Sequence, residues 1–188
     1  MIEVIIKMKV ISGIYKGREI IGYDLIGTRP TTSRVKESLF SMLQEYLIDS
    51  TILDLFSGSG NLAIESLSNG AKEAYVVDSN IKAIKTINTN IKNIKVKNCK
   101  VIKDDYRNIL KKFGEEDKQF NIIFLDPPYN TNYIEISIKL ITDYNLLKTA
   151  GIIVCETNNI EKIIYPSSLK IIKNKKYNDK YIVILQKI

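Results

Sequence analysis

The sequence contains no histidine, and this absence excludes several kinds of site. Zinc sites built on imidazole, Ser-His-Asp triads and histidine general bases all need that side chain. The two cysteines, Cys99 and Cys155, are far apart, and neither follows a proline. The chain therefore lacks a Cys-x-x-Cys motif and the Pro-Cys nucleophile used against carbon 5 of pyrimidines. We expect reduced thiols and no metal site.

Long apolar runs are also lacking, and basic residues outnumber acidic ones. No stretch approaches the ~18 apolar residues of a membrane span, and the apolar run at residues 1–7 is too short for a secretory signal. We therefore expect a cytoplasmic protein without membrane contact. Lys and Arg number 28 against 21 Asp and Glu, a formal net charge of +7. This balance favours a polyanionic partner such as a nucleic acid, although a solvated lysine-rich surface gives the same charge.

The hydrophobic pattern divides the 188 residues into two parts. Residues 1–48 predict a small extension, with a hairpin over 8–21 and an amphipathic helix after residue 33. From residue 49 to 188, short apolar strands alternate with amphipathic helices. This alternation predicts an α/β domain with a doubly wound, seven-stranded, mostly parallel sheet. A turn at 178–179 closes the sheet with an antiparallel C-terminal hairpin.

Two helices have a recognisable apolar face. The face of the first is expected to contain Val35, Leu39, Met42, Leu43, Tyr46 and Leu47. The face of the helix that follows residue 80 is expected to contain Ile81, Ile84, Ile87 and Ile91. Both sets follow the 3.6-residue period of a buried helix face.

A glycine-rich turn follows the first strand of the α/β domain, in the segment Asp54-Leu55-Phe56-Ser57-Gly58-Ser59-Gly60. Ligands of open α/β sheets bind beyond the carboxyl ends of the strands, where glycines let the backbone approach closely. The glycines also fit the G-x-G-x-x-A pattern of dinucleotide sites, so a dehydrogenase and a turn without ligand remain alternatives. The Asp54 carboxylate would repel a pyrophosphate, whereas it can hold the ammonium group of S-adenosylmethionine.

Carboxylates also end the next two strands. Asp78 is expected where a carboxylate can accept hydrogen bonds from both ribose hydroxyls, and Asp104 and Asp105 where an adenine would lie.

A second motif, Asp126-Pro127-Pro128-Tyr129, follows the fourth strand. The prolines fix the backbone and leave carbonyl groups without neighbouring donors. An aryl amine is a weak nucleophile because its lone pair is delocalised into the ring. The Asp126 carboxylate and the Pro127 carbonyl can accept both amine protons and favour a pyramidal nitrogen, and Tyr129 can stack on a flipped-out base.

These segments together resemble the bacterial RsmD family, which methylates the 2-amino group of one guanine in small-subunit (16S) ribosomal RNA. The resemblance covers nearly the whole chain. It is carried by Met8-Lys9-Val10-Ile11-Ser12-Gly13, Gly17-Arg18, Arg29-Pro30-Thr31-Thr32, Val35-Lys36-Glu37-Ser38-Leu39-Phe40, the glycine-rich turn, Glu65, Asn69-Gly70-Ala71 and Asp126-Pro127-Pro128-Tyr129.

The resemblance implies a class I, Rossmann-like methyltransferase fold, S-adenosylmethionine as methyl donor, and ribosomal RNA in an assembling small subunit as partner. By position, the donor's amino-acid part is assigned to Asp54, Phe56, Gly58, Ser59 and Gly60, its ribose to Asp78 and its adenine to Asp105. Asp126, Pro127 and Tyr129 are assigned to the guanine. Two positions depart from the family pattern: Tyr129 replaces the commoner Phe, and Lys36 stands where Arg is usual.

Two other functions remain open at this point. An adenine or cytosine amino-methyltransferase acting on DNA would use the same chemistry, but it generally carries a separate target-recognition domain. A non-catalytic RNA-binding module would not need both motifs.

The cations of residues 1–40 outnumber the acids, and we expect an RNA-docking face there. Its candidate contacts are Lys16, Arg18, Arg29 and Arg34, with Lys7, Lys9 and Lys36 nearby. The lysines from Lys82 to Lys103 are interpreted as a solvated helix face, and a monomer is expected.

Overall fold

The computed structural model describes residues 7–22, 33–129 and 131–188. The order of elements is β1 (Lys7–Lys9), β2 (Glu19–Ile21), α1 (Ser33–Leu47), β3 (Thr51–Asp54), α2 (Asn61–Ser68), β4 (Glu73–Asp78), α3 (Ile81–Ile94), β5 (Cys99–Lys103), α4 (Tyr106–Glu115), β6 (Phe120–Leu125), α5 (Tyr133–Asp143), β7 (Leu147–Thr157), a 3-10 turn η1 (Ile160–Lys162), β8 (Leu169–Tyr177) and β9 (Lys180–Lys187).

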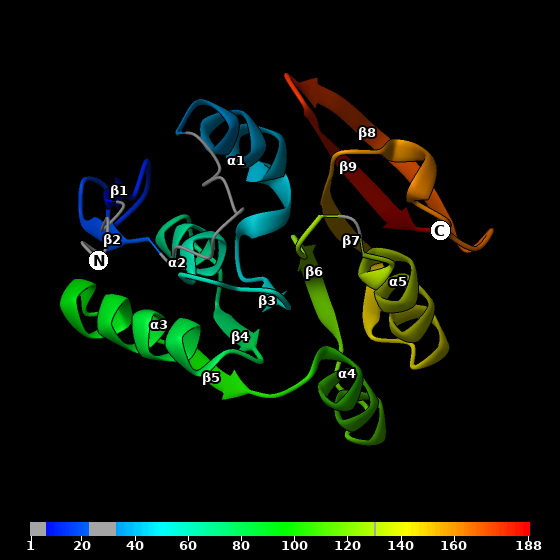
Figure 1. Ribbon diagram of the computed structural model, residues 1–188, viewed down its shortest axis with the longest axis horizontal. Helices are drawn as coiled ribbons and strands as arrows, with labels where there is room; N and C mark the ends of the chain where they lie inside the picture. The colour runs from blue at the N-terminus through cyan, green and yellow to red at the C-terminus, as the bar shows by residue number, and fades with distance from the viewer. Residues whose placement is uncertain (1–6, 23–32, 130) are drawn as a thin grey trace.

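Seven strands form one sheet in the order β5-β4-β3-β6-β7-β9-β8 (Figure 1). β5, β4, β3, β6 and β7 run parallel, whereas β9 pairs antiparallel with β7 and β8 pairs antiparallel with β9. The predicted class I methyltransferase sheet and its C-terminal hairpin are thus confirmed. The chain reverses its winding direction between β3 and β6, so the edge beyond these two strands is the switch point at which such sheets bind ligands.

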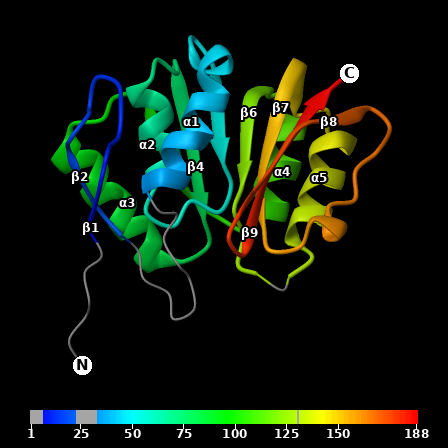
Figure 2. The ribbon, with the colours of Figure 1, turned by 90° about the horizontal axis from the view of Figure 1, so that it is seen from above.

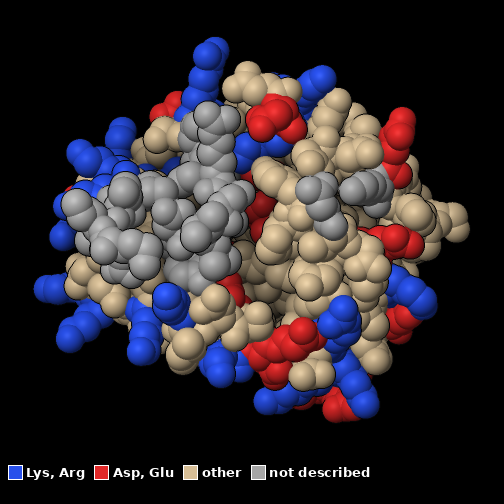
Figure 3. Space-filling model, in the orientation of Figure 1, with Lys and Arg blue, Asp and Glu red and all other residues tan. Residues whose placement is uncertain are grey.

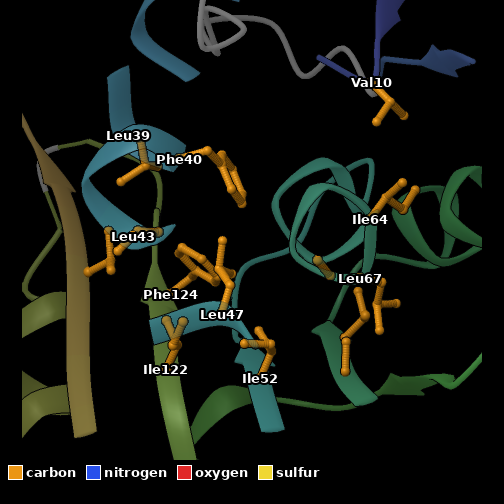
Figure 4. Close-up of a cluster of buried hydrophobic side chains, with 14 of the residues drawn as sticks. Val10, Leu39, Phe40, Leu43, Leu47, Ile52, Ile64, Leu67, Ile122 and Phe124 are labelled. Carbon is orange, nitrogen blue, oxygen red and sulfur yellow. The ribbon is translucent and has the colours of Figure 1, made fainter. Parts of the chain in front are cut away.

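Helices cover both faces of the sheet (Figures 1 and 2). α1, α2 and α3 pack on one face and α4 and α5 on the other. Successive strand residues alternate between the two cores, as the twofold period of a strand requires. In β3 and β6, for example, Ile52 and Phe124 belong to the first core and Leu53 and Ile123 to the second. Figure 4 shows part of the first core, where side chains of α1 and α2 converge on Ile52, Ile122 and Phe124.

The N-terminal hairpin packs against this first layer. β1 and β2 pair antiparallel with Met8 opposite Ile20, and Val10 and Ile20 are buried in the first core. At the tip of the hairpin, the Ile14 N–H donates to the carbonyl of Ser68 in α2 over 2.8 Å. A β-carbon at Gly13 would lie only 1.8 Å from that carbonyl oxygen, and Gly13 has a φ of +78°. The close packing of hairpin on α2 therefore requires glycine at this position.

Four details differ from the sequence prediction. Helix α4 was missed, although Tyr106, Ile109, Leu110 and Phe113 form its buried face. In α1, the buried set also contains Phe40 and Lys36, whereas Met42 and Tyr46 are only partly buried. In α3, Ile81 is 50% exposed because it lies in the first turn, beyond the edge of the core. β7 begins at Leu147 rather than residue 151 and contains Ala150 with a φ of +58°.

Candidate active site

Three aspartates lie at the carboxyl ends of three adjacent strands. Asp78 ends β4, Asp54 ends β3, and Asp126 directly follows β6. The parallel registers place Asp54 beside Val76 on one side and Phe124 on the other. Burial and the charge of Glu156 raise the pKa of Asp126, and the charge of Asp54 adds to this; burial raises the pKa of Asp54, and the charge of Asp78 adds to that. The two sequence motifs therefore meet in one electronegative region at the switch point, where a cationic ligand is favoured. Acidic side chains are visible deep between the two halves of the face in Figure 3.

The glycine-rich turn between β3 and α2 is held by hydrogen bonds from several elements. The Ser57 hydroxyl donates to the Asp54 carbonyl over 2.6 Å and accepts from the Val77 N–H over 3.1 Å. Gly58 and Gly60 have φ values of +55° and +76°, which non-glycine residues adopt at a cost. The Asn90 side chain donates to the Ser59 carbonyl over 2.9 Å, which ties the turn to α3. The backbone around a bound ligand is thus fixed in advance.

Asp54 is a buried carboxyl group with a strongly raised pKa. Its side chain is 2% exposed, and its Oδ2 atom has no hydrogen-bond partner among the described residues. Burial, together with the charge of Asp78, raises the pKa of Asp54 to about 7, against the opposing effect of the nearby Ser57 hydroxyl and Ala63 N–H. A buried carboxylate oxygen without a partner is expensive, so this atom is where a ligand cation would be bound most favourably.

Asp78 and Asp105 differ in how much of their carboxylate is already used. Asp78 accepts the N–H of Gly58 on one oxygen at 2.9 Å and the N–H of Asn80 on the other at 2.8 Å. Each oxygen keeps a second lone pair, so the oriented carboxylate can still accept two hydroxyl groups. Asp105 caps α4 by accepting from the Arg107 N–H at 2.8 Å, and its carboxylate lies 3.6 Å from the Arg107 guanidinium. Helix capping accounts for its position without a ligand.

An aromatic cluster lies beside the turn, and sequence reasoning found only one of its members. Phe56 stacks on Tyr133 with ring centroids 5.9 Å apart, and Tyr106 lies 5.2 Å from Phe56 and 5.0 Å from Tyr133. The Tyr106 hydroxyl is buried without a hydrogen-bond partner among the described residues. The cluster joins the starts of α4 and α5 to the turn, and its signal in the sequence is an aromatic residue in the first turn of each helix.

A buried ion pair lies beneath the Asp-Pro-Pro-Tyr segment, and sequence reasoning missed it entirely. Glu156 in β7 accepts a hydrogen bond from the Tyr129 hydroxyl, with 3.0 Å between the two oxygens, and forms an ion pair with Lys180 in β9. Both charged side chains are less than a tenth exposed. Burial first, then the charge of Glu156, raises the pKa of Asp126 well above its ordinary value, while Lys180 lowers it. Lys180 thus limits the repulsion between two neighbouring carboxylates.

A cavity of about 440 Å³ opens next to this motif. Pro127, Pro128 and Tyr129 line one side, and Glu156 and Thr157 line another. This volume is in the range of small-molecule sites. Its mixed lining of a ring, a proline edge and carboxylates fits a flat heterocycle that carries N–H donors.

The residues around the glycine-rich turn fit S-adenosylmethionine. The unpartnered Asp54 oxygen fits the ammonium group, the Asp78 carboxylate fits the ribose diol, and the glycines leave room for the backbone to approach.

Among the described residues there is no group of three or more His, Cys, Asp or Glu side chains that would hold a metal ion. Both cysteines are free, and burial raises the pKa of each thiol to about 12, which makes them unreactive.

Three of the four expected RNA-docking residues lie within the described part of the chain. Lys16, Arg18 and Arg34 are exposed, whereas Arg29 lies outside the described residues. Lys36 was wrongly placed on that face, because its side chain is 1% exposed. Its ammonium group lies 2.6 Å from Glu65 and donates to Asn61 and to the Lys9 carbonyl at 2.9 and 2.8 Å. It therefore joins α1, α2 and the hairpin rather than binding a substrate.

Known proteins share this sequence and fold. The family model described as conserved hypothetical protein 95 matches residues 8–186. Ribosomal RNA small subunit methyltransferase D of Buchnera aphidicola subsp. Acyrthosiphon pisum is 34% identical over 90% of this chain and 87% of its own length. The Bacillus subtilis protein YlbH is 41% identical over 79% of this chain and 82% of its own length.

A solved structure agrees with the architecture. That of the Escherichia coli protein yhhF superposes with a TM-score of 0.85 at 28% identity, covering 96% of this chain and 98% of the other. Since the family model spans nearly all of the sequence and the fold agrees, the chain belongs to the RsmD family, whose model is described as conserved hypothetical protein 95.

Proposed function

We propose that this protein transfers the methyl group of S-adenosylmethionine to the exocyclic 2-amino group of a guanine in small-subunit (16S) ribosomal RNA. The observation that carries the proposal is that Asp54, Asp78 and Asp126 lie at the carboxyl ends of three neighbouring strands. The cavity is lined by Pro127 and Tyr129 of the second motif, whereas Asp126 and the glycine-rich turn are not among its lining residues. One motif accounts for donor binding and the other for the amine.

Different residues of the chain are assigned to the methyl donor and to the target amine. Asp54 would hold the ammonium group of the donor and Asp78 its ribose, and the donor would supply a methyl group on a sulfonium sulfur. Asp126 and the Pro127 carbonyl accept the two amine protons and direct the nitrogen lone pair towards the methyl carbon. As the new C–N bond forms and the donor's S–CH3 bond breaks, the amine loses one proton, and Asp126 is placed to accept it. A carboxylate whose pKa is raised by burial is a stronger base than an exposed one.

Tyr129 supplies the stacking surface for the flipped base. Its hydroxyl is anchored on Glu156, which fixes the plane of the ring before the base arrives. Fixing the ring in advance reduces the ordering cost of binding.

The proposal includes the partner and its setting. The names of the small-subunit methyltransferase D relatives support ribosomal RNA as the substrate. We propose that residues 1–48 form the RNA-docking extension and residues 49–188 the catalytic domain, acting as a monomer on an assembling small subunit in the cytoplasm. None of the described helices is long and apolar enough to cross a membrane.

Methyl transfer to defined acceptors tests the proposal. Purified protein with S-adenosylmethionine labelled on the methyl group would be offered small-subunit particles and naked 16S RNA from a strain lacking the enzyme, and double-stranded DNA. We expect label in RNA, recovered after nuclease digestion as 2-methylguanosine. Label in DNA alone, or in 6-methyladenine or 4-methylcytosine, would overturn the assignment.

A further inference from the structure

We propose that α3 and the N-terminal hairpin form one continuous RNA-binding face, on which the α3 lysines contact substrate phosphates beside the docking hairpin. This inference rests on the proposed function, because it takes RNA as the substrate. It departs from the interpretation of these lysines as a solvated helix surface, and the reason is a set of contacts that the sequence does not reveal.

The charge of this segment has one sign. Between Asp78 and Asp104 the sequence has seven lysines and no acidic residue. Five of these lysines have exposed side chains on α3 or directly after it: Lys82, Lys85, Lys92, Lys95 and Lys97. Lysines three residues apart on a helix repel one another, so the helix carries an internal cost.

Helices on the opposite face of the sheet are built differently. Lys111 in α4 lies 3.8 Å from Glu115, and Lys139 in α5 lies 2.5 Å from Asp143, each one turn along its helix. Among the described residues, none of the five exposed lysines of the α3 segment is in an ion pair. If these lysines served only solubility, both signs would be expected to alternate on α3 as they do on α4 and α5. A polyanion would supply the missing counter-charge.

The hairpin packs directly against α3 and continues its charge. The Asn90 side chain accepts the Ile21 N–H and donates to the Ile21 carbonyl, both at 2.9 Å. Further along, the Lys97 N–H donates to the Tyr15 hydroxyl over 3.3 Å. Lys16 adjoins Tyr15, so the cations at the hairpin tip lie next to those at the end of α3. Figure 3 shows basic side chains gathered on the left, over the hairpin and α3, whereas both signs mix at the lower right.

The position of α3 relative to the donor site completes the argument. The helix starts just after Asp78 and Asn80, at the edge where the donor would bind, and its 14 residues extend about 20 Å away from that edge. A strand whose target base reaches Asp126 can therefore place neighbouring phosphates along the helix. The hairpin alone is shorter, because its strands contain three residues each.

Charge removal on two faces tests this surface. One variant carries Lys85→Gln, Lys92→Gln and Lys97→Gln, and the matched control carries Lys111→Gln, Lys112→Gln and Lys139→Gln. All six side chains are exposed, so both variants should fold and bind S-adenosylmethionine as the wild type does. Binding to small-subunit particles and to naked 16S RNA would be measured from 0.05 to 0.3 M salt, together with KM and kcat.

The expected result is specific to one variant. Loss of three phosphate contacts should weaken RNA binding about 10- to 100-fold at 0.1 M salt and lower the slope of log K against log salt by about 2. KM for RNA should rise by the same factor with kcat unchanged, while the control stays within about twofold. An unchanged slope in the α3 variant, or an equal loss in the control, would overturn the α3 surface. Failure of the proposed function is separate, since the wild type would then methylate no RNA.

Discussion

Replacing Asp54 by Asn should stabilise the ligand-free protein while abolishing donor binding. The two side chains have nearly the same shape, so the change isolates the charge. Asp54 is buried, and one of its oxygens has no partner among the described residues. The ligand-free fold therefore carries a charge that is favourable only when a ligand cation is present.

The size of the effect follows from the pKa. Burial and Asp78 raise the pKa of Asp54 from 3.8 to about 7. Because the folded state binds this proton more tightly than the unfolded state, the penalty is absent well below pH 4, grows between pH 4 and 7, and is constant above. One pKa unit corresponds to about 1.4 kcal/mol, so the penalty in the free energy of unfolding reaches about 4 kcal/mol above pH 7. The asparagine N–H₂ group lacks an acceptor and costs about 1 kcal/mol, which leaves a net gain of about 3 kcal/mol at pH 8.

Urea unfolding of both proteins from pH 5 to 8.5 measures this difference, and calorimetry with S-adenosylmethionine measures the loss of binding. The advantage of Asp54→Asn should shrink towards zero as the pH falls. In the wild type, donor affinity should weaken as the pH falls below 7, because Asp54 must then lose a proton. A variant that is less stable than the wild type at pH 8, or a difference that does not change with pH, would refute the electrostatic account.

Three further changes probe other parts of the site. Asp126→Ala should leave donor affinity intact and reduce kcat by roughly 100-fold or more, as single-turnover methylation would show, because a preorganised acceptor is lost. Tyr129→Phe should raise KM for RNA a few-fold with little change in kcat, since stacking survives while the anchor on Glu156 is lost; a large fall in kcat would contradict this. Lys36→Met should cost about 3–5 kcal/mol in urea unfolding, because Glu65 is left buried and unpaired, and adding Glu65→Gln should recover part of the loss. No recovery would argue against the ion pair as the cause.

Much of the site could be predicted because the positions of its residues follow from the short stretch of sequence around each strand end. A buried strand followed by a polar residue places that residue at the carboxyl edge, so Asp54, Asp78 and Asp126 were located from the sequence. The parallel sheet then brings them together without further information. The predicted N-terminal hairpin is likewise confirmed by pairing of β1 with β2.

The missed features depend on partners far apart in the sequence. Glu156 and Lys180 are 24 residues apart and meet only because β7 pairs with β9. Lys36 reads as one cation among many until Glu65 is placed beside it. Helix α4 was missed although its four buried positions follow the 3.6-residue period and Asp105 was available as its cap.

The absence of a side chain at Gly13 also fixes where the N-terminal hairpin lies relative to α2. The tip of the hairpin contacts the Ser68 carbonyl, and the Lys36 ammonium group donates a hydrogen bond to the Lys9 carbonyl. These two contacts hold the hairpin in one position on α2. The distance between the hairpin and the carboxyl edge of the sheet, where Asp54 and Asp126 lie, is then constant. If the hairpin docks RNA as proposed, a substrate whose docking surface and target nucleotide are separated by a different distance would bind poorly at the active site.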